Sequence, residues 1–411
     1  MRTSSRTRAM QLALVSVAAA TAIALTGCAT GGSSTSGPSA GSSATSTASA
    51  RSAPATKSHP VTATATPTPT TTAGGPELAG FAATSVTFVS ADEAFVLGAA
   101  PCGHAACTAI VRTLDRGVSW VGLPTPVVPL GDPYANSGQA AVWGVRFADQ
   151  ENGFVFGNGL WVTTDGGERW TAIASPGGSI VDLEVIHGQL LALSYACSAQ
   201  SGCAQPGTLY RRALSGGPWS VVAPVSGARV IATQARVAAV LDNGSAVVTG
   251  DGGLTFAIRA TPCNTPTTGG SAVAVTSPDS LALLCAGGAA MGSVQKTVYV
   301  SDNLGATWAR AGAPPFAGDP WEIAAGTPTE LTVAAASGAS WLYHSADGGA
   351  QWSTAYKSIG GGAAFNDLGF TTTADGVAVF GPTYQDGNPY RMPGRLLLTR
   401  DGGASWTAVR F

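Results

Sequence analysis

Short apolar runs separated by turn residues recur along the chain from residue 76 to its end. One unit shows the order clearly, because it contains the successive segments WGVRFADQ, NGFVFG, LWVTT and WTAIAS, with a polar turn before the last. The first run alternates apolar and polar residues, and Gly, Asn and Asp bound the runs, which is typical of β-strands. Four short strands in each unit predict the four-stranded antiparallel blades of a β-propeller.

A polar phrase, here called the repeated turn, precedes the last strand of each unit. Its pattern is Ser/Thr-x-Asp-x-Gly-x-x-aromatic, as in TTDGGERW at 163–170. Its acidic or amide position is Asp115, Asp165, Asp251, Asn303, Asp347 or Asp401, and its closing aromatic is Trp120, Trp170, Phe256, Trp308, Trp352 or Trp406. A seventh stretch, RALSGGPW, ends in Trp219 and lacks the Asp. The intervals are about fifty residues, apart from a shorter one before Phe256, so we expect an all-β propeller of seven blades, the fourth having least room for its strands.

The residue types of the repeated turn indicate a structural task. An Asp side chain accepts hydrogen bonds from backbone N–H groups just ahead of it, and the Ser/Thr hydroxyl braces the same turn. Glycine at the fifth position adopts a positive φ without a Cβ clash. The Trp supplies a large apolar plug with an indole N–H that needs a partner. We therefore expect these residues to hold the fold and to do no chemistry.

The repeated turn resembles the Asp-box, or BNR, repeat of sialidase-like propellers. The longer stretch VRFADQENGFVFGNGLWVTTDGGERW is similar to the repeat of photosystem II assembly-factor-like propellers, and this repeat pattern covers nearly all of 83–411. The resemblance implies that the box is structural and lies away from the ligand-binding face. It also implies a non-catalytic protein that binds a polypeptide during assembly of a membrane complex, although nothing in the chain points to photosynthesis.

The N-terminal residues read as a targeting segment and a linker. Arg2, Arg6 and Arg8 precede the apolar run Met10 to Leu25, which is the pattern of a secretory signal. The following LTGC resembles the bacterial lipoprotein box, which implies cleavage before Cys28 and lipid on that residue; the alternative is a plain signal peptide with an incidental cysteine. Residues 29–75 are nearly all Ser, Thr, Ala, Gly and Pro, so we expect disorder there. The expected divisions are a signal peptide at 1–27, a lipidated linker at 28–75 and the propeller at 76–411, on the outer side of the cell membrane.

Charge argues against nucleic-acid binding, and the cysteine content indicates disulfides. The chain has 21 Lys and Arg against 23 Asp and Glu, without the basic stripe that a nucleic-acid binder needs. Six cysteines besides Cys28 favour disulfides in an exported chain, with Cys102 near Cys107, Cys197 near Cys203, and Cys263 and Cys285 left over. A zinc site on Cys102, His104 and Cys107 is the alternative, but a closed site needs a fourth ligand. We expect a monomer without metal or cofactor.

Strand order assigns the connections of each blade to two faces. The repeated turn joins the third and fourth strands, so it shares a face with the turn between the first and second. The opposite face, here called the loop face, receives the long aromatic segments, and binding residues gather on such loops. The residues that we expect to bind a protein or a glycan there are Tyr134, Trp143, Phe316, Trp321, Phe365, Tyr384, Tyr390 and Arg391. Trp143 lies next to a first strand, so it is also a candidate for a plug between blades.

Polar residues on the innermost strands and their approaches predict a lined axial channel. They are Arg146, Asp182, Glu184, Arg229, Glu322 and Asp367, and we expect them to be solvated and to pair with one another. A glycoside hydrolase is the alternative function, with Asp182 and Asp367 as its carboxyl groups. The chain lacks the Arg-Ile/Leu-Pro element with which sialidases begin, and it shows no serine-nucleophile, zinc-protease or phosphate-loop motif. A non-catalytic binding module is therefore the expected function.

Overall fold

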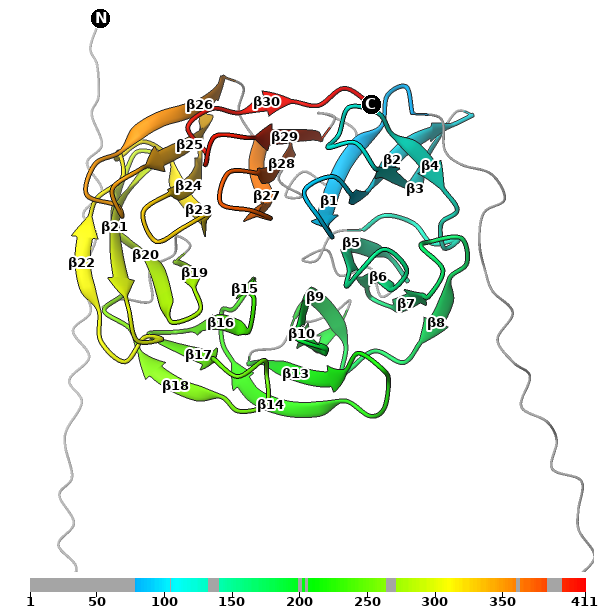
Figure 1. The fold of residues 1–411 in the computed structure, drawn as a ribbon, viewed down its shortest axis with the longest axis horizontal. Coiled ribbons are helices and arrows are strands. Elements are labelled where there is room, and N and C mark those ends of the chain that lie inside the picture. The colour runs from blue at the N-terminus through cyan, green and yellow to red at the C-terminus, as the bar shows by residue number, and fades with distance from the viewer. Residues whose placement is uncertain are drawn as a thin grey trace, which may run out of the picture. The chain divides into compact units, whose positions relative to one another are not determined.

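A computed structural model of the protein describes residues 78–103, 105–131, 140–198, 202–203, 206–263, 271–359, 363–382 and 394–411. These residues form seven four-stranded antiparallel sheets, set as blades around a central axis (Figure 1). The chain is a seven-bladed β-propeller, as its repeats predict. Within the described ranges no helix is long and apolar enough to cross a membrane.

Each blade uses four strands consecutive along the chain, with the first at the axis and the fourth at the rim. Blade 1 comprises β1 (Ala82–Phe88), β2 (Ala94–Cys102), β3 (Ala105–Thr113) and β4 (Val121–Leu123), and blade 2 comprises β5 (Val142–Phe147), β6 (Gly153–Gly157), β7 (Leu160–Thr163) and β8 (Thr171–Ile173). Blade 3 comprises β9 (Ser179–Ile186), β10 (Gln189–Tyr195), β13 (Gly207–Ala213) and β14 (Ser220–Val225), with the short pair β11 (Cys197–Ser198) and β12 (Gly202–Cys203) inserted between its second and third strands.

The remaining four blades follow the same order. Blade 4 comprises β15 (Ile231–Gln234), β16 (Val237–Asp242), β17 (Ser245–Thr249) and β18 (Ala257–Ala260), and blade 5 comprises β19 (Ala272–Ser277), β20 (Ser280–Ala290), β21 (Ser293–Ser301) and β22 (Ala309–Gly312). Blade 6 comprises β23 (Asp319–Ala325), β24 (Leu331–Ala336), β25 (Ala339–Ser345) and β26 (Ser353–Ile359), and blade 7 comprises β27 (Ala363–Phe370), β28 (Gly376–Pro382), β29 (Arg395–Thr399) and β30 (Thr407–Ala408). Blade 4 thus completes all four strands despite its short interval, because the connection that leads into it, residues 226–230, and its first turn, residues 235–236, are short.

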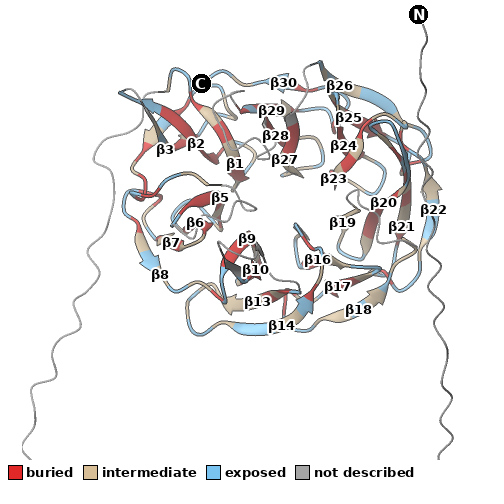
Figure 2. Ribbon diagram, turned by 180° about the vertical axis from the view of Figure 1, so that it is seen from behind, coloured by how far each residue is buried: buried red, intermediate tan, exposed pale blue. Residues whose placement is uncertain are grey.

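The core lies between neighbouring blades. The second strands are almost wholly buried, as in β10 and β24, because each has a blade packed on both of its faces; this explains their continuous apolar sequences. Burial falls toward the rim, where the fourth strands are largely exposed or intermediate (Figure 2). At the interface of blades 1 and 2, the rings of Phe95 and Phe147 stack with their centroids 3.5 Å apart.

The propeller closes between blade 7 and blade 1 without sharing a strand, since each takes its four strands from its own end of the described chain. The closing contact, here called the seam, is made by packing and by isolated polar bonds. The amide of Ala83 donates to the carbonyl of Gly394 at 3.2 Å. The ring of Phe411 packs against Phe81 at 4.6 Å and against Trp120 at 5.1 Å between centroids.

Candidate functional site

Backbone hydrogen bonds establish the two faces of the propeller. In blade 2 the amide of Gly166, inside the repeated turn, donates to the carbonyl of Glu151 in the turn between β5 and β6, at 2.9 Å. The equivalent bond recurs in five other blades, from Arg116, Gly252, Leu304, Gly348 and Gly402. The two kinds of turn therefore share one face, here called the turn face, and the remaining connections form the loop face.

The repeated turn of blade 2 is closed by its own side chains. The amide of Gly167 donates to Thr163 Oγ1 at 2.9 Å, and the amide of Arg169 donates to Asp165 Oδ1 at 2.9 Å. Gly166 and Gly167 have φ values of 72° and 93°, in the left-handed region that favours glycine. Burial opposes the shift, but hydrogen bonds from Arg169 and Thr163 hold the pKa of Asp165 below its ordinary value. The carboxylate of Asp165 is thus occupied by hydrogen bonds within the turn.

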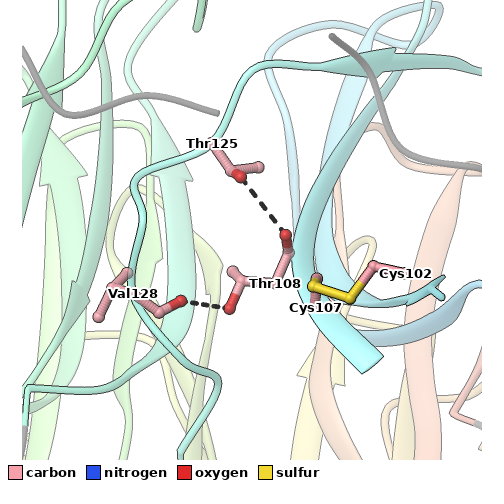
Figure 3. The surroundings of a disulfide bond; sticks show 5 residues. All are labelled: Cys102, Cys107, Thr108, Thr125 and Val128. Atoms are coloured by element: carbon pink, nitrogen blue, oxygen red, sulfur yellow. Dashed lines mark hydrogen bonds between the residues drawn. A yellow bond between two sulfur atoms is a disulfide. The ribbon is translucent and has the colours of Figure 1, made fainter. Parts of the chain in front are cut away.

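Two disulfides lie on the loop face. Cys102 bonds to Cys107 at the tip of the β2–β3 hairpin, with their Cα atoms 5.8 Å apart, and Cys263 bonds to Cys285 across 5.3 Å. Next to Cys107, Thr108 Oγ1 donates to the carbonyl of Val128, which ties the hairpin to the connection leading to blade 2 (Figure 3). The expected pairing of Cys197 with Cys203 concerns side chains outside the described part, although their backbones pair in β11 and β12.

The disulfide between Cys102 and Cys107 argues against the alternative of a zinc site on these two cysteines and His104. Cys102 and Cys107 have no thiolate to offer a metal once they are bonded to each other. His104 lies outside the described residues. Among the described residues, no group of three or more His, Cys, Asp or Glu side chains is arranged to hold a metal ion.

The structure corrects part of the predicted binding set. Trp143 and Phe365 are buried, so they do not belong to an exposed binding surface. The indole of Trp143 donates to the carbonyl of Ile180 in blade 3, and the ring packs in the core between blades 2 and 3. Phe365 packs between blades 6 and 7, and Trp321 is partly buried against the same cluster. Tyr134, Tyr384, Tyr390 and Arg391 lie outside the described residues.

Phe316, from the predicted binding set, and four further apolar side chains are exposed on the loop face. Met291, at the tip of the β20–β21 hairpin, is fully exposed, and Phe316, on the connection from blade 5 to blade 6, is 50 % exposed. Val127, Val230 and Ile359 are exposed on the connections that leave blades 1, 3 and 6. Single exposed apolar residues need no explanation, but five on one face, from different connections, give that face an apolar character.

The axial residues form one charged cluster around Arg146. Its Nε donates to Glu184 at 2.6 Å, and its Nη2 lies 2.8 Å from Asp367 and 3.6 Å from Asp182. The expected mutual pairing is thereby confirmed for these four residues. Arg229 is exposed on the connection before β15.

Backbone amides hold the acidic side chains of this cluster in place. Asp182 accepts from Ile231, Asp367 accepts from Val86, and Glu322 accepts from Leu368, at 2.7, 2.9 and 2.9 Å. Because each bond crosses from one blade to the next, the cluster ties the innermost strands together. An axial charge that is paired in this way costs far less than an isolated one.

Burial sets the proton affinities in the cluster. It raises the pKa of Asp182 to about 7, aided by the negative charge of Glu184, and it raises the pKa of Glu322 to about 8. Burial also raises the pKa of Glu184. It opposes the shift of Arg146, but the carboxylates of Asp367, Glu184 and Asp182 raise the pKa of that guanidinium well above its ordinary value. One permanent cation thus faces four acids, some of which keep a proton near neutral pH.

Sequence reasoning missed Lys296, which is buried in the middle of β21. Its Nζ lies within hydrogen-bond distance of four backbone carbonyls, those of Val294, Phe316, Ala317 and Gly318, which share its three N–H donors. Burial lowers the pKa of Lys296 to about 8, against the effect of Asp319, so the ammonium form prevails at neutral pH. A signal was present, because Lys296 is in phase with the inward-facing Val294 and Val298.

Comparisons with known proteins agree with this architecture. No protein-family model matches the chain, and no curated protein matches it in sequence. A solved structure of YCF48 bound to a D1 peptide has a TM-score of 0.51 at 17 % identity, covering 83 % of this chain and 99 % of that one. YCF48 from Cyanidioschyzon merolae has a TM-score of 0.50 at 14 % identity, covering 78 % and 96 %. A xyloglucanase of family GH74 from Xanthomonas campestris has a TM-score of only 0.32 at 14 % identity, covering 80 % and 72 %. At these identities the similarity to YCF48 shows a shared fold.

Proposed function

We propose that the protein is a membrane-tethered, non-catalytic propeller that binds a polypeptide partner through its loop face. The observation that carries this proposal is the exposure of Met291 and Phe316 on neighbouring connections of that face. Large apolar side chains on loops that a rigid scaffold holds are typical of binding surfaces, because they bury apolar area when a partner binds. Glycans are the alternative partner, and the test below separates them.

The fold comparison supports the partner class. YCF48 is a propeller of similar fold whose structure holds a D1 peptide. The proposal transfers to this chain only the idea that a propeller face receives a peptide. A role in assembling an envelope complex would follow if the partner belonged to one.

The axial carboxyl groups are poorly arranged for hydrolysis. Asp182 and Asp367 both lie against Arg146, and each also accepts a backbone N–H. A glycosidase needs one carboxyl to give a proton to the leaving group while the other attacks or activates water. Although the raised pKa of Asp182 suits an acid, these partners hold both carboxyl groups within the wall of the channel.

Crosslinking on intact cells tests the binding proposal. Met291→Ser with Phe316→Ser is expected to reduce crosslinks to a protease-sensitive partner, while Val118→Ser with Leu254→Ser, which removes exposed apolar side chains from the turn face, is the matched control. Equal yields from the two double variants, with unchanged melting temperatures, would show that the loop face is not the binding surface. Loss of capture after glycosidase treatment alone would replace the polypeptide with a glycan.

A second assay tests the hydrolase alternative. The propeller is incubated with sialosides and common glycosides, and no turnover is expected. Turnover that disappears in Asp182→Asn or Asp367→Asn would establish a glycosidase and remove the non-catalytic proposal.

The tether is tested at Cys28. We propose that this residue carries the lipid, because LTGC immediately follows the apolar signal. Cys28→Ser is expected to prevent labelling with a palmitate analogue and to release the protein into the medium. A variant that stays in the membrane fraction with the same processed N-terminus as the unaltered protein would contradict lipidation.

A further inference from the structure

The side chain of Lys296 ends in a cage of backbone oxygens. Its Nζ lies 2.7 Å from the carbonyl oxygen of Gly318, 2.9 Å from that of Val294, 3.0 Å from that of Phe316 and 3.1 Å from that of Ala317. The residue is 1 % exposed, and no ion pair to it occurs among the described residues. An ammonium group has three N–H donors and no acceptor, so converging carbonyls suit it.

Three of the four oxygens belong to one loop-face segment, residues 313–318. This segment joins blade 5 to blade 6 and carries the half-exposed Phe316. Its end pairs with β21 through a parallel bridge between Ser293 and Gly318, and the amide of Val294 donates to Gly318 at 3.4 Å. On the other side, the hydroxyl of Tyr343 donates to Ala317 at 3.0 Å.

The same bridge places the β20–β21 hairpin beside that segment. Met291, in the turn just before Ser293, and Phe316, just before Gly318, therefore both lie near this bridge on the loop face. Few backbone hydrogen bonds hold 313–318, which contains Pro314 and Pro315 and so lacks two donors. The four bonds from Nζ are therefore a large share of what fixes this segment.

We infer that Lys296 is a tethered cation that locks residues 313–318 onto the β20–β21 hairpin and thereby fixes the position of Phe316 on the loop face. Carbonyl oxygens are also the groups that hold hard metal ions, and the ammonium occupies the position that such an ion would take. Without the ammonium the four oxygens lose their common partner, and the segment gains freedom. The lock is a property of the fold and does not depend on what the loop face binds.

Cleavage by chymotrypsin after Phe316 reports on the lock, because a protease cuts a segment that is free to move. In the full chain, Lys296→Met keeps the length of the side chain and removes its donors. We expect cleavage at this bond to become about tenfold faster or more, together with faster exchange of the Val294 amide. Lys357→Met, at an exposed position of β26, is the matched control and is expected to change neither.

The same measurements can also contradict the inference. Cleavage after Phe316 and exchange of Val294 at the rates of the unaltered protein would overturn the inference. If Lys296→Met does not fold, Lys296→Ala is refolded with propylammonium, which restores the missing chain and charge, or with propan-1-ol, which restores the chain and one O–H donor without the charge. Recovery with propylammonium only is expected, and equal effects of the two compounds, including none, would overturn the role of the cation.

Discussion

The indole of Trp170 donates a hydrogen bond to the backbone carbonyl of Pro124, 3.0 Å away, and so joins blade 2 to blade 1. Pro124 lies four residues after Trp120, the closing aromatic of the preceding unit. Trp219 and Trp308 repeat the relationship, since they donate to Ala174 and Ala260, which lie four residues after Trp170 and Phe256. Trp120 faces the seam, and its buried Nε1 has no hydrogen-bond partner among the described residues.

This contrast predicts different effects for one substitution at two similar sites. Trp170→Phe and Trp120→Phe remove similar buried area, but only the first breaks a hydrogen bond and leaves the Pro124 carbonyl unpaired. We expect Trp170→Phe to lower the free energy of unfolding by about 1–2 kcal/mol more than Trp120→Phe. Urea denaturation of both variants measures the difference, and equal losses would show that the bond contributes nothing.

Much of the fold was predictable because its stabilising elements are local in sequence. The turn that contains Asp165 and Gly167 needs only residues within a few positions of each other, so its pattern survives in the sequence. Strand order then assigned the two faces, which the bond from Gly166 to Glu151 confirms. Even the fourth blade, with its short interval, follows the pattern, because its connections are short.

The site was less predictable because it depends on contacts between distant segments. Trp143 and Phe365 flank loops in the sequence, but the neighbouring blades cover them, and only the packing of blade on blade reveals this. Lys296 finds its partners about twenty residues further along the chain, in a segment without any motif. The alternation of β21 could have placed Lys296 inward, but it could not have identified those partners.

One blade already carries Asn in place of the Asp of the repeated turn, and this predicts the effect of the same substitution in blade 2. Asn303 accepts from the amide of Thr307 at 2.9 Å, as Asp165 does from Arg169. Asp165→Asn is therefore expected to keep most of the stability, while Asp165→Ala leaves backbone donors without this acceptor and lowers the free energy of unfolding by on the order of 1–3 kcal/mol. Thermal unfolding of the two variants tests this, and an Asn variant as unstable as the Ala variant would show that charge, not geometry, matters.

The axial cluster predicts how stability depends on pH. Burial raises the pKa of Glu322 to about 8 from an ordinary 4.5, so the folded state binds that proton more tightly than the unfolded chain does. The corresponding stabilisation is complete below about pH 4.5 and is lost as the pH rises through 8. Glu322→Gln cannot ionise and still offers an oxygen to Leu368, so it is expected to melt above the unaltered protein at pH 8.5 and level with it at pH 5.

A charge-matched variant separates this effect from a change in net charge. Glu168 lies exposed in the repeated turn of blade 2, and Glu168→Gln removes the same charge without touching the axis. It is expected to leave the slope of melting temperature against pH unchanged. If both variants flatten the slope equally, the pH dependence does not arise in the axial cluster.

The seam is the interface where we expect the propeller to open first. Blades 7 and 1 come from opposite ends of the described chain, so no connection joins them directly as one joins every other pair of neighbouring blades, and the ring of Phe411 fills the space between Phe81 and Trp120. Phe411→Ala removes these contacts and is expected to lower the free energy of unfolding by about 2–3 kcal/mol, less than a fully buried ring would, because Phe411 is only partly buried. Phe316→Ala, which removes the same ring from a position outside the seam, is the control variant. Hydrogen exchange should then accelerate in β1 and β29 of the Phe411 variant, while β10 and β16 on the far side keep their protection. Uniform acceleration around all seven blades, or none in β1 and β29, would show that the propeller unfolds as one unit and that the seam is no weaker than the other interfaces.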